Sequence, residues 1–481
     1  MAKSSAKHGG MSQLILKAMG IFGGVQILNI LCSVIRTKLV ALWIGPVGVG
    51  LFGLFNQALE MLNVATNLGV RNSSVRDISQ AVERRDRTFI CRIVTVVRRW
   101  SMWLGWAGVV LTIAMAPLLS RLTFGDFNHV WNYVALSIAV LFMALTNGEY
   151  AVLQGLSKLK RLASVTVSGT VGGLIISIPL FYFLREASVL PSIIAYALCV
   201  VVAAFVRRDK EYPSASVTSK ETVKMGTGFI KLGIYMTLGS FVAIISSYAF
   251  VSWMNIYSGT EDVGFYQAGY TLVNKYAGLV FAALGMEFYP RLSRVAHSAR
   301  RIRVFVSQEM NIAFIVLTPC LLAFILLRSQ LVWLLYSKDF EVIVSYISWG
   351  VLGTVLRAAS WCMAFVMLAK GDGRTYLITE SLSAIVGLVL NIVCFSIWGI
   401  VGLGYAYLAW YAFYTIIVAV VYFKVYRLTL SSMCFYSMIG VLFVCGAAVV
   451  AMECGTWVIA LILFLVASPV CLYLAYRAWK R

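Results

Sequence analysis

Amide side chains recur at helical spacing inside segments that are otherwise apolar. In the segment 45–70, Asn56, Glu60, Asn63 and Asn67 follow one another at intervals of three and four residues, so they share one helix face. Comparable positions in 14–44 and 262–286 are Gln26, Asn29, Gln267, Thr271 and Asn274. An unpaired amide or hydroxyl in hydrocarbon costs about 2–7 kcal/mol, so these faces predict polar neighbours. Two explanations stay open: a hydrated cavity between two halves of the protein, or hydrogen bonds between adjacent helices.

Charged side chains occur in the same apolar segments. A charge near the centre of a membrane helix costs at least about 2.5–3.5 kcal/mol, and it usually marks a transport route or a paired site. The most central positions are Glu60, Lys275 and Arg357. Arg36 and Lys38 lie one or two turns inside the outer end of 14–44, where they either line a cavity or extend to the membrane surface. Because this set is net cationic, we expect an anionic substrate bound through phosphate or diphosphate.

Two further carboxylates, Glu149 and Glu380, are candidates for coupling or gating. They lie within two turns of the predicted cytoplasmic face, where they could pair with loop arginines. The ten cysteines contain no C-x-x-C pair, and the three histidines fall in a terminus or in loops. We therefore predict no metal site, no cofactor and no catalytic residue.

The composition places these residues in a membrane protein. Of 481 residues, 61% are hydrophobic and 12% are charged, and the mean hydropathy is +0.87. The net charge of +21 comes from basic residues in short loops between apolar segments. Orientation in a bilayer explains this pattern better than nucleic-acid binding does.

Fourteen segments are long and apolar enough to span a bilayer, which needs roughly 20 residues per helix. They form two sets of six followed by a pair. The predicted spans are 14–44, 45–70, 100–122, 131–155, 162–184, 188–206, 225–257, 262–286, 310–335, 342–369, 375–397, 400–423, 433–452 and 457–476.

The basic residues also predict the topology. Most of the 40 Lys and Arg fall in the amino terminus, the even-numbered connections and the carboxyl tail if the amino terminus is cytoplasmic. Both termini are therefore expected in the cytoplasm. The loops on the other side are short, which leaves no room there for a folded catalytic domain.

The two sets of six helices are predicted to be a duplication. The run Val49-Gly50-Leu51-Phe52 has a counterpart in Val263-Gly264-Phe265-Tyr266, and Lys17 and Asp126 have counterparts at nearly the same separation in Lys231 and Asp339. The expected fold is all-α, with two six-helix lobes related by a pseudo-two-fold axis along the membrane normal. The predicted boundaries are 1–206 for the first lobe, 207–224 for a flexible cytoplasmic linker, 225–430 for the second lobe and 431–481 for an added helix pair and tail.

The glycine-rich run from Ile44 to Phe52 resembles a motif of the polysaccharide transporter (Wzx) family, the O-unit flippases of the multidrug/oligosaccharidyl-lipid/polysaccharide (MOP) superfamily. The second half is similar in the run from Asp262 to Tyr270, closed by Tyr289-Pro290-Arg291-Leu292-Ser293. Val152-Leu153-Gln154-Gly155, followed by Lys160, is similar to the family's turn between helices 4 and 5. The added helix pair brings the helix count nearer to the lipid II flippase branch, so the implied fold is like that of MATE exporters and MurJ.

This resemblance implies a flippase of the bacterial inner membrane. Its substrate would be an undecaprenyl-diphosphate-linked oligosaccharide repeat unit, moved from the cytoplasmic to the periplasmic leaflet by alternating access for surface polysaccharide such as O-antigen or capsule. Membrane lipids and other polysaccharide-assembly proteins are the further partners it implies. Lys38 matches a basic position before the Gly-Pro motif in some relatives.

Two alternatives belong to other classes. A cation-coupled MATE drug exporter shares the fold, but it predicts carboxylates in the first or seventh helix, and residues 14–44 and 225–257 contain no Asp or Glu. A membrane polymerase or glycosyltransferase of the same pathway needs paired carboxylates, histidines or an acidic outer loop. The short outer loops and scattered histidines argue against that enzyme.

Overall fold

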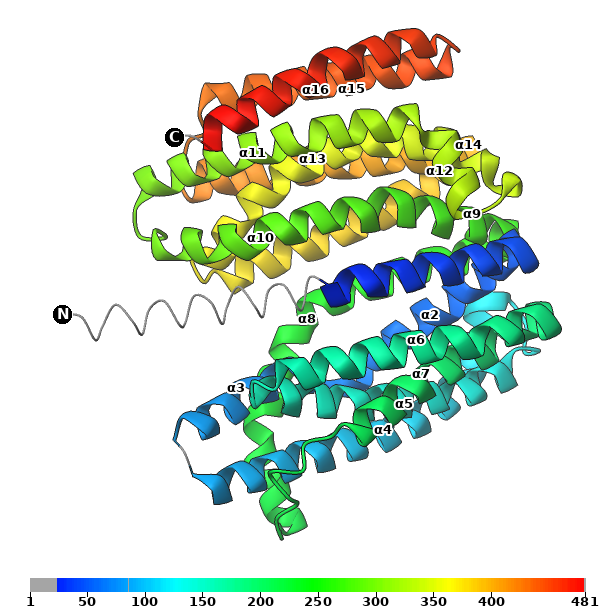
Figure 1. The fold of residues 1–481 in the computed structure, drawn as a ribbon, viewed down its shortest axis with the longest axis vertical. Coiled ribbons are helices and arrows are strands. Elements are labelled where there is room, and N and C mark those ends of the chain that lie inside the picture. Colours follow the sequence, from blue (N-terminus) through cyan, green and yellow to red (C-terminus); the bar gives the residue numbers. More distant parts are fainter. Residues whose placement is uncertain (1–23, 85, 480–481) are drawn as a thin grey trace. The chain divides into compact units, whose positions relative to one another are not determined.

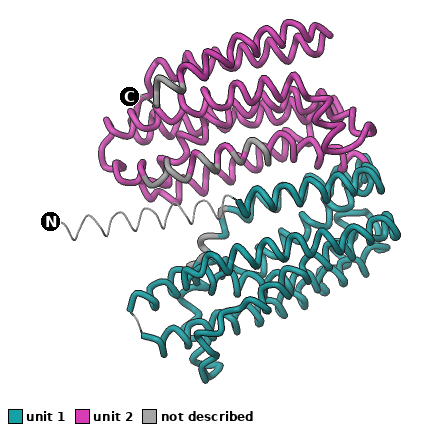
Figure 2. The backbone as a smooth tube through the Cα atoms, viewed as in Figure 1, with its two compact units in different colours: residues 1–260 teal, residues 261–481 magenta. Residues whose placement is uncertain are grey.

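The computed structural model describes residues 24–84 and 86–479, and every regular element in that part of the chain is a helix (Figure 1). Eleven of these helical stretches are long and apolar enough to cross a bilayer. The predicted all-α membrane fold is thereby confirmed. The chain forms two compact units, residues 1–260 and 261–481 (Figure 2).

The first unit begins with a helix at Gly24–Trp43 and ends with the long helix α8. Its other helices pack beside one another in antiparallel pairs, of which α4 with α5 and α6 with α7 make the most extensive contacts. The bounds are α2 Pro46–Asn67, α3 Val70–Glu83, α4 Arg87–Phe124, α5 Val130–Gly155, α6 Leu159–Leu184, the 3-10 turn η1 Arg185–Ser188, α7 Val189–Val206 and α8 Ser219–Ser258.

The second unit has α13 and α14 at its centre and carries the carboxyl-terminal pair α15 and α16 against α11. A π-helical turn, η2, separates α9 from α10. The bounds are α9 Thr260–Tyr270, η2 Thr271–Lys275, α10 Tyr276–Arg294, α11 Ala299–Leu326, α12 Arg328–Leu335, η3 Lys338–Val342, α13 Ile343–Ala369, α14 Gly373–Val420, η4 Val421–Val425, α15 Ser432–Glu453 and α16 Trp457–Trp479.

Two of the eleven spanning stretches contain a turn and therefore each make a pair of helices. Leu159–Val206 turns at η1, and Gly373–Val425 turns at Gly399, which has a φ of 60° that glycine adopts without strain. The stretch from α9 to α10 supplies a further long helix interrupted by η2. This arrangement is consistent with the predicted total of fourteen.

Local sequence signals set the helix ends. Pro46 starts α2 directly after Gly45, and Leu68 and Gly69 end it in left-handed conformations. The Asp86 carboxylate accepts hydrogen bonds from the main-chain N–H groups of Thr88 and Phe89 at 3.0 and 3.1 Å, which caps α4. A capping box of Thr218 and Glu221 starts α8 in the same way.

The segment 207–218 is held against the first unit rather than extending freely, which corrects the expectation of a flexible linker. The buried Asp209 carboxylate accepts hydrogen bonds from Lys158 and, at 2.9 Å, from Arg161. The Ala215 N–H donates to the Thr95 hydroxyl at 2.9 Å. The composition of the segment suggested mobility, but its one buried carboxylate fixes it to the turn before α6. The predicted boundaries of the duplicated lobes stay a prediction.

The outward surfaces of both units are strongly apolar. Trp131, Phe183 and Phe443 expose 79%, 78% and 75% of their surface, although each unit has a buried apolar core of its own. Exposing such large apolar surfaces to water is unfavourable, so in the membrane they contact lipid. A functional site is therefore sought among the polar side chains of the interior.

Candidate functional site

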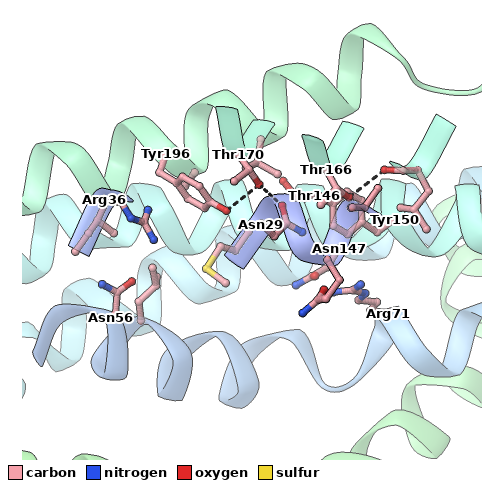
Figure 3. A pocket seen from close by; sticks show the side chains of 18 residues that line it. Asn29, Arg36, Asn56, Arg71, Thr146, Asn147, Tyr150, Thr166, Thr170 and Tyr196 are labelled. Atoms are coloured by element: carbon pink, nitrogen blue, oxygen red, sulfur yellow. Dashed lines mark hydrogen bonds between the residues drawn. The ribbon is translucent and has the colours of Figure 1, made fainter. Parts of the chain in front are cut away.

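A cavity of about 470 Å³ lies inside the first unit, between the first helix and α2, α5, α6 and α7 (Figure 3). Four residues predicted from the sequence line it together: Gln26, Asn29, Arg36 and Asn56. The other polar side chains on its wall are Arg71, Thr146, Asn147, Tyr150, Thr166, Thr170 and Tyr196. We call it the Arg36 cavity.

The Arg36 guanidinium is stacked between two aromatic rings. Its carbon lies 4.9 Å from the centre of the Phe52 ring and 4.7 Å from that of Tyr196. Within the described part of the chain, no hydrogen-bond acceptor or carboxylate partner of this guanidinium is present. The rings fix the plane of the cation through its faces and leave its N–H edge available to a ligand.

Arg71 is a second cation on the cavity wall, and its sequence context does not distinguish it from the other loop arginines. It follows the Leu68-Gly69 break at the start of α3, and its guanidinium lies 5.1 Å from the Tyr150 ring centre. In the sequence it is the first of many arginines after an apolar segment. The helix break at Leu68 and Gly69 is the signal that could have distinguished Arg71 from the arginines that follow it.

Amide and hydroxyl groups connect the helices around the cavity. The Thr170 hydroxyl donates to the side-chain oxygen of Asn29 at 2.9 Å, which connects the first helix to α6 (Figure 3). The Asn63 side-chain oxygen accepts from Asn147 at 3.3 Å and also from Asn67. Asn63 therefore joins α2 to α5 beside the cavity, while Asn67 bonds within α2, so the explanation by hydrogen bonds between adjacent helices holds for Asn63.

The Arg36 cavity is cationic. Its described wall contains two arginines and no Asp or Glu. The nearby carboxylate of Glu149 is buried and already paired, since Arg98 donates to it at 2.8 and 3.0 Å through Nε and Nη2. The sequence suggested a loop arginine as the partner, but Arg98 lies inside α4. An anion with several oxygens is the ligand that such a wall can hold.

Two other predicted charges of the first unit lie outside this cavity. Glu60 is exposed on the surface of α2, and Lys38 is half-buried beyond the cavity wall. Glu60 and Asn56 both lie in α2, as their spacing predicted, but only Asn56 lines the Arg36 cavity.

A second cavity, of about 270 Å³, lies in the second unit between α13 and α14, and Arg357 and Glu380 both line it. Arg357 donates through Nη1 to the Asn274 side chain, to the Asn274 main-chain oxygen at 3.4 Å and to the Tyr407 hydroxyl at 3.3 Å. Glu380 accepts a hydrogen bond from the Tyr414 hydroxyl. We call this the Arg357 cavity.

The remaining predicted residues surround the π-helical turn. Asn274 bonds to Arg357, and Thr271 begins the turn. The buried Nε2 of Gln267 has no hydrogen-bond partner among the described residues. The Lys275 side chain lies outside the described residues. One hydrated cavity shared by both halves stays a prediction.

Comparison with known proteins places this geometry in a family. Residues 39–345 match the model of the polysaccharide biosynthesis protein family. The chain is 23% identical to the lipid III flippase of Escherichia coli (strain K12) over 390 residues, which cover 78% of this chain and 90% of that protein.

Two solved structures show the same fold. The lipid II flippase MurJ in an inward closed conformation has a TM-score of 0.71 at 13% identity, covering 97% of this chain and 100% of that one. An inward-facing multidrug resistance MATE transporter of the MOP superfamily has a TM-score of 0.68 at 14% identity, covering 82% and 92%. These proteins are flippases and transporters by name, and the likeness shows that this chain shares their fold. Because the family model spans more than half of the sequence, the chain belongs to the polysaccharide biosynthesis protein family and has the fold of the MOP transporters.

Proposed function

We propose that this protein is a flippase for an undecaprenyl-diphosphate-linked oligosaccharide repeat unit. The observation that carries the proposal is the Arg36 cavity, where two arginines line a wall without a described carboxylate. The stacked Arg36 guanidinium has an N–H edge suited to two phosphate oxygens at once. The similarity to a lipid III flippase supports a lipid-linked substrate.

The proposal includes a location and a direction. The protein would lie in the bacterial inner membrane with both termini in the cytoplasm, as the distribution of basic residues favours. It would take the repeat unit from the cytoplasmic leaflet and release it in the periplasmic leaflet by alternating access, with proteins of polysaccharide assembly as further partners. Gln26, Asn29 and Asn56 would bind the polar headgroup beside the diphosphate.

Replacing Arg36 in cells that depend on the protein tests this function. We expect Arg36→Gln to lower surface glycan at least about tenfold, because one charged hydrogen bond contributes about 1.5–3 kcal/mol. Arg36→Lys should keep part of the export, since it retains the charge without the planar fork. The lipid-linked glycan should accumulate inside the cells at the same time.

Arg121→Gln is the matched control, because Arg121 is exposed at the end of α4 and does not line the cavity. It should leave export unchanged. Full surface glycan in the Arg36→Gln strain, at normal levels of the protein in the membrane, would refute the assignment.

A MATE-type drug exporter is the second candidate, because a MATE transporter shares the fold. Cation coupling would use carboxylates in the first or seventh helix, and residues 14–44 and 225–257 contain no Asp or Glu. Raised drug resistance on overexpression, with no effect on surface glycan, would favour the exporter.

A further inference from the structure

The Arg357 cavity differs in chemistry from the Arg36 cavity. Half of the residues on its wall are aromatic, and the wall also carries one cation and one carboxylate. The aromatic side chains that line it are Trp361, Phe365, Tyr376, Tyr411 and Tyr414. At about 270 Å³ it is slightly smaller than the pockets that enclose a drug-sized ligand. A single small ring is the size of group that fits.

The Trp361 ring is held in place from several sides. Its centre lies 5.5 Å from that of Phe281, 5.8 Å from that of Phe288 and 4.7 Å from that of Phe365. A Cβ at Gly285 would lie 3.1 Å from the Trp361 ring, so α10 approaches it closely there. The cavity is therefore lined by an indole whose orientation is fixed before any ligand binds.

The polar groups of the cavity have unused hydrogen-bonding capacity. Glu380 accepts from Tyr414 through Oε1, and within the described residues Oε2 has no partner. Arg357 uses Nη1 for Asn274 and Tyr407, while its Nη2 and Nε have no described acceptor. The wall therefore presents an acceptor and several donors next to aromatic faces.

A sugar ring has the matching chemistry. Its C–H faces pack on aromatic rings, and its hydroxyl groups both donate and accept hydrogen bonds around the edge. A second phosphate fits less well, because Glu380 would oppose its charge. An isolated cation would be opposed by Arg357 in the same way.

We propose that the Arg357 cavity binds one uncharged sugar ring of the transported headgroup, with Trp361 as the stacking surface and Glu380 as the hydrogen-bond acceptor. This inference rests on the proposed function, because it concerns the glycan of the same substrate.

Binding to two lipids separates the two assignments. One probe is sugar-free polyprenyl diphosphate, and the other is the pool of polyprenyl-diphosphate glycans extracted from source cells that lack the protein. Binding of each is measured to the purified full-length protein in nanodiscs. The wild type should bind the glycan pool more tightly than the sugar-free lipid.

Glu380→Gln and Trp361→Ala should each reduce this preference about tenfold and leave the affinity for the sugar-free lipid unchanged. Trp361→Tyr, which keeps an aromatic face, should retain part of the preference. Trp457→Ala is the matched control, because Trp457 is 59% exposed on α16, away from the cavity. Arg36→Gln should weaken binding of both lipids.

Each other outcome has a separate meaning. If the wild type binds both lipids equally, or if the Glu380 and Trp361 variants weaken both alike while remaining folded by thermal unfolding, the sugar site is wrong and the proposed function stands. If neither lipid binds to the wild type, the proposed function itself fails.

Discussion

Arg36 and Arg357, both half-buried, show how the role of such a charge depends on which of its hydrogen-bond donors are occupied. Arg36 is held by the Phe52 and Tyr196 rings and keeps its N–H edge for a ligand. Arg357 donates to the Asn274 main-chain oxygen and side chain at the π-helical turn. Such turns break the regular hydrogen-bond pattern of a helix, and π-helical turns often lie at functional sites. Arg357 therefore positions the turn as well as lining its cavity.

The buried pair of Arg98 and Glu149 gives a prediction at the same scale. Their side chains are 13% and 4% exposed, so removing one partner leaves a charge in a poorly hydrated site. We expect Glu149→Gln to reduce the free energy of unfolding by about 3–5 kcal/mol, measured as a lower thermal midpoint in detergent.

Glu211→Gln is the comparison for this variant. Glu211 also pairs with a cation, Lys158, but its side chain is 59% exposed, so the loss should be about 0–1 kcal/mol. Equal shifts of the thermal midpoint in the two variants would mean that burial does not determine how much the Arg98–Glu149 pair contributes to stability.

At the scale of elements, helix breaks place the cavity residues. Leu68 and Gly69 end α2 in left-handed conformations, and Arg71 then starts α3 at the cavity. Helix α8 crosses this break at Gly233 with no space for a side chain. A Cβ on Gly233 would lie 2.1 Å from the Leu68 main-chain oxygen. The contact between α8 and the break thus depends on glycine at this position.

Substitution at Gly233 tests that contact. Gly233→Ala should reduce the free energy of unfolding by about 1–3 kcal/mol, because the backbone must move to admit the methyl group. Gly228→Ala, in the same helix with nothing within 4 Å of its Cβ, should be neutral or slightly stabilising. Thermal unfolding of both variants gives the comparison, and a neutral Gly233→Ala would contradict the close approach.

The segment 207–218 gives a second prediction for an element. Asp209→Asn should weaken the contacts with Lys158 and Arg161 and make trypsin cleave this segment at least about tenfold faster. Glu211→Gln, in the same segment, should change cleavage little. Unchanged cleavage of the Asp209 variant would mean that Asp209 does not hold the segment.

The same cluster has a defined pH dependence. Burial lowers the pKa of Lys158, but hydrogen bonds with Asp209 and Glu211 raise it overall above its ordinary value of 10.5. Its contribution to stability is therefore complete below pH 10.5 and is lost as the pH rises through the raised pKa. Trypsin sensitivity of the wild type should stay constant from pH 7 to pH 9.

For the whole molecule, the fold was predictable because each spanning helix needs a long apolar run, and such runs are visible in the sequence. The predicted 433–452 and 457–476 correspond closely to α15 and α16. The behaviour of the segment 207–218 was not predictable in this way. Its polar composition is typical of a linker, and tertiary contacts such as those of Asp209 and Ala215 hold it in place.

The site was predictable in part. Arg36, Asn29 and Asn56 line one cavity inside the first unit, whereas their polar faces had suggested a cavity between the two halves. Helical spacing shows which side chains share a face, but it does not show where the opposite helix closes the space. Asn63 therefore meets Asn147 instead of the cavity, and Arg71 looked like any other loop arginine.

Translocation by the purified protein in proteoliposomes tests the central claim most directly. Extracted polyprenyl-diphosphate glycan is placed in the vesicles, and its arrival in the outer leaflet is followed with a glycan-binding lectin that does not cross the membrane. We predict rapid translocation by the wild type and a rate at least about tenfold lower for Arg36→Gln. Equal rates for the wild type and Arg36→Gln, or no translocation by the wild type, would contradict the account.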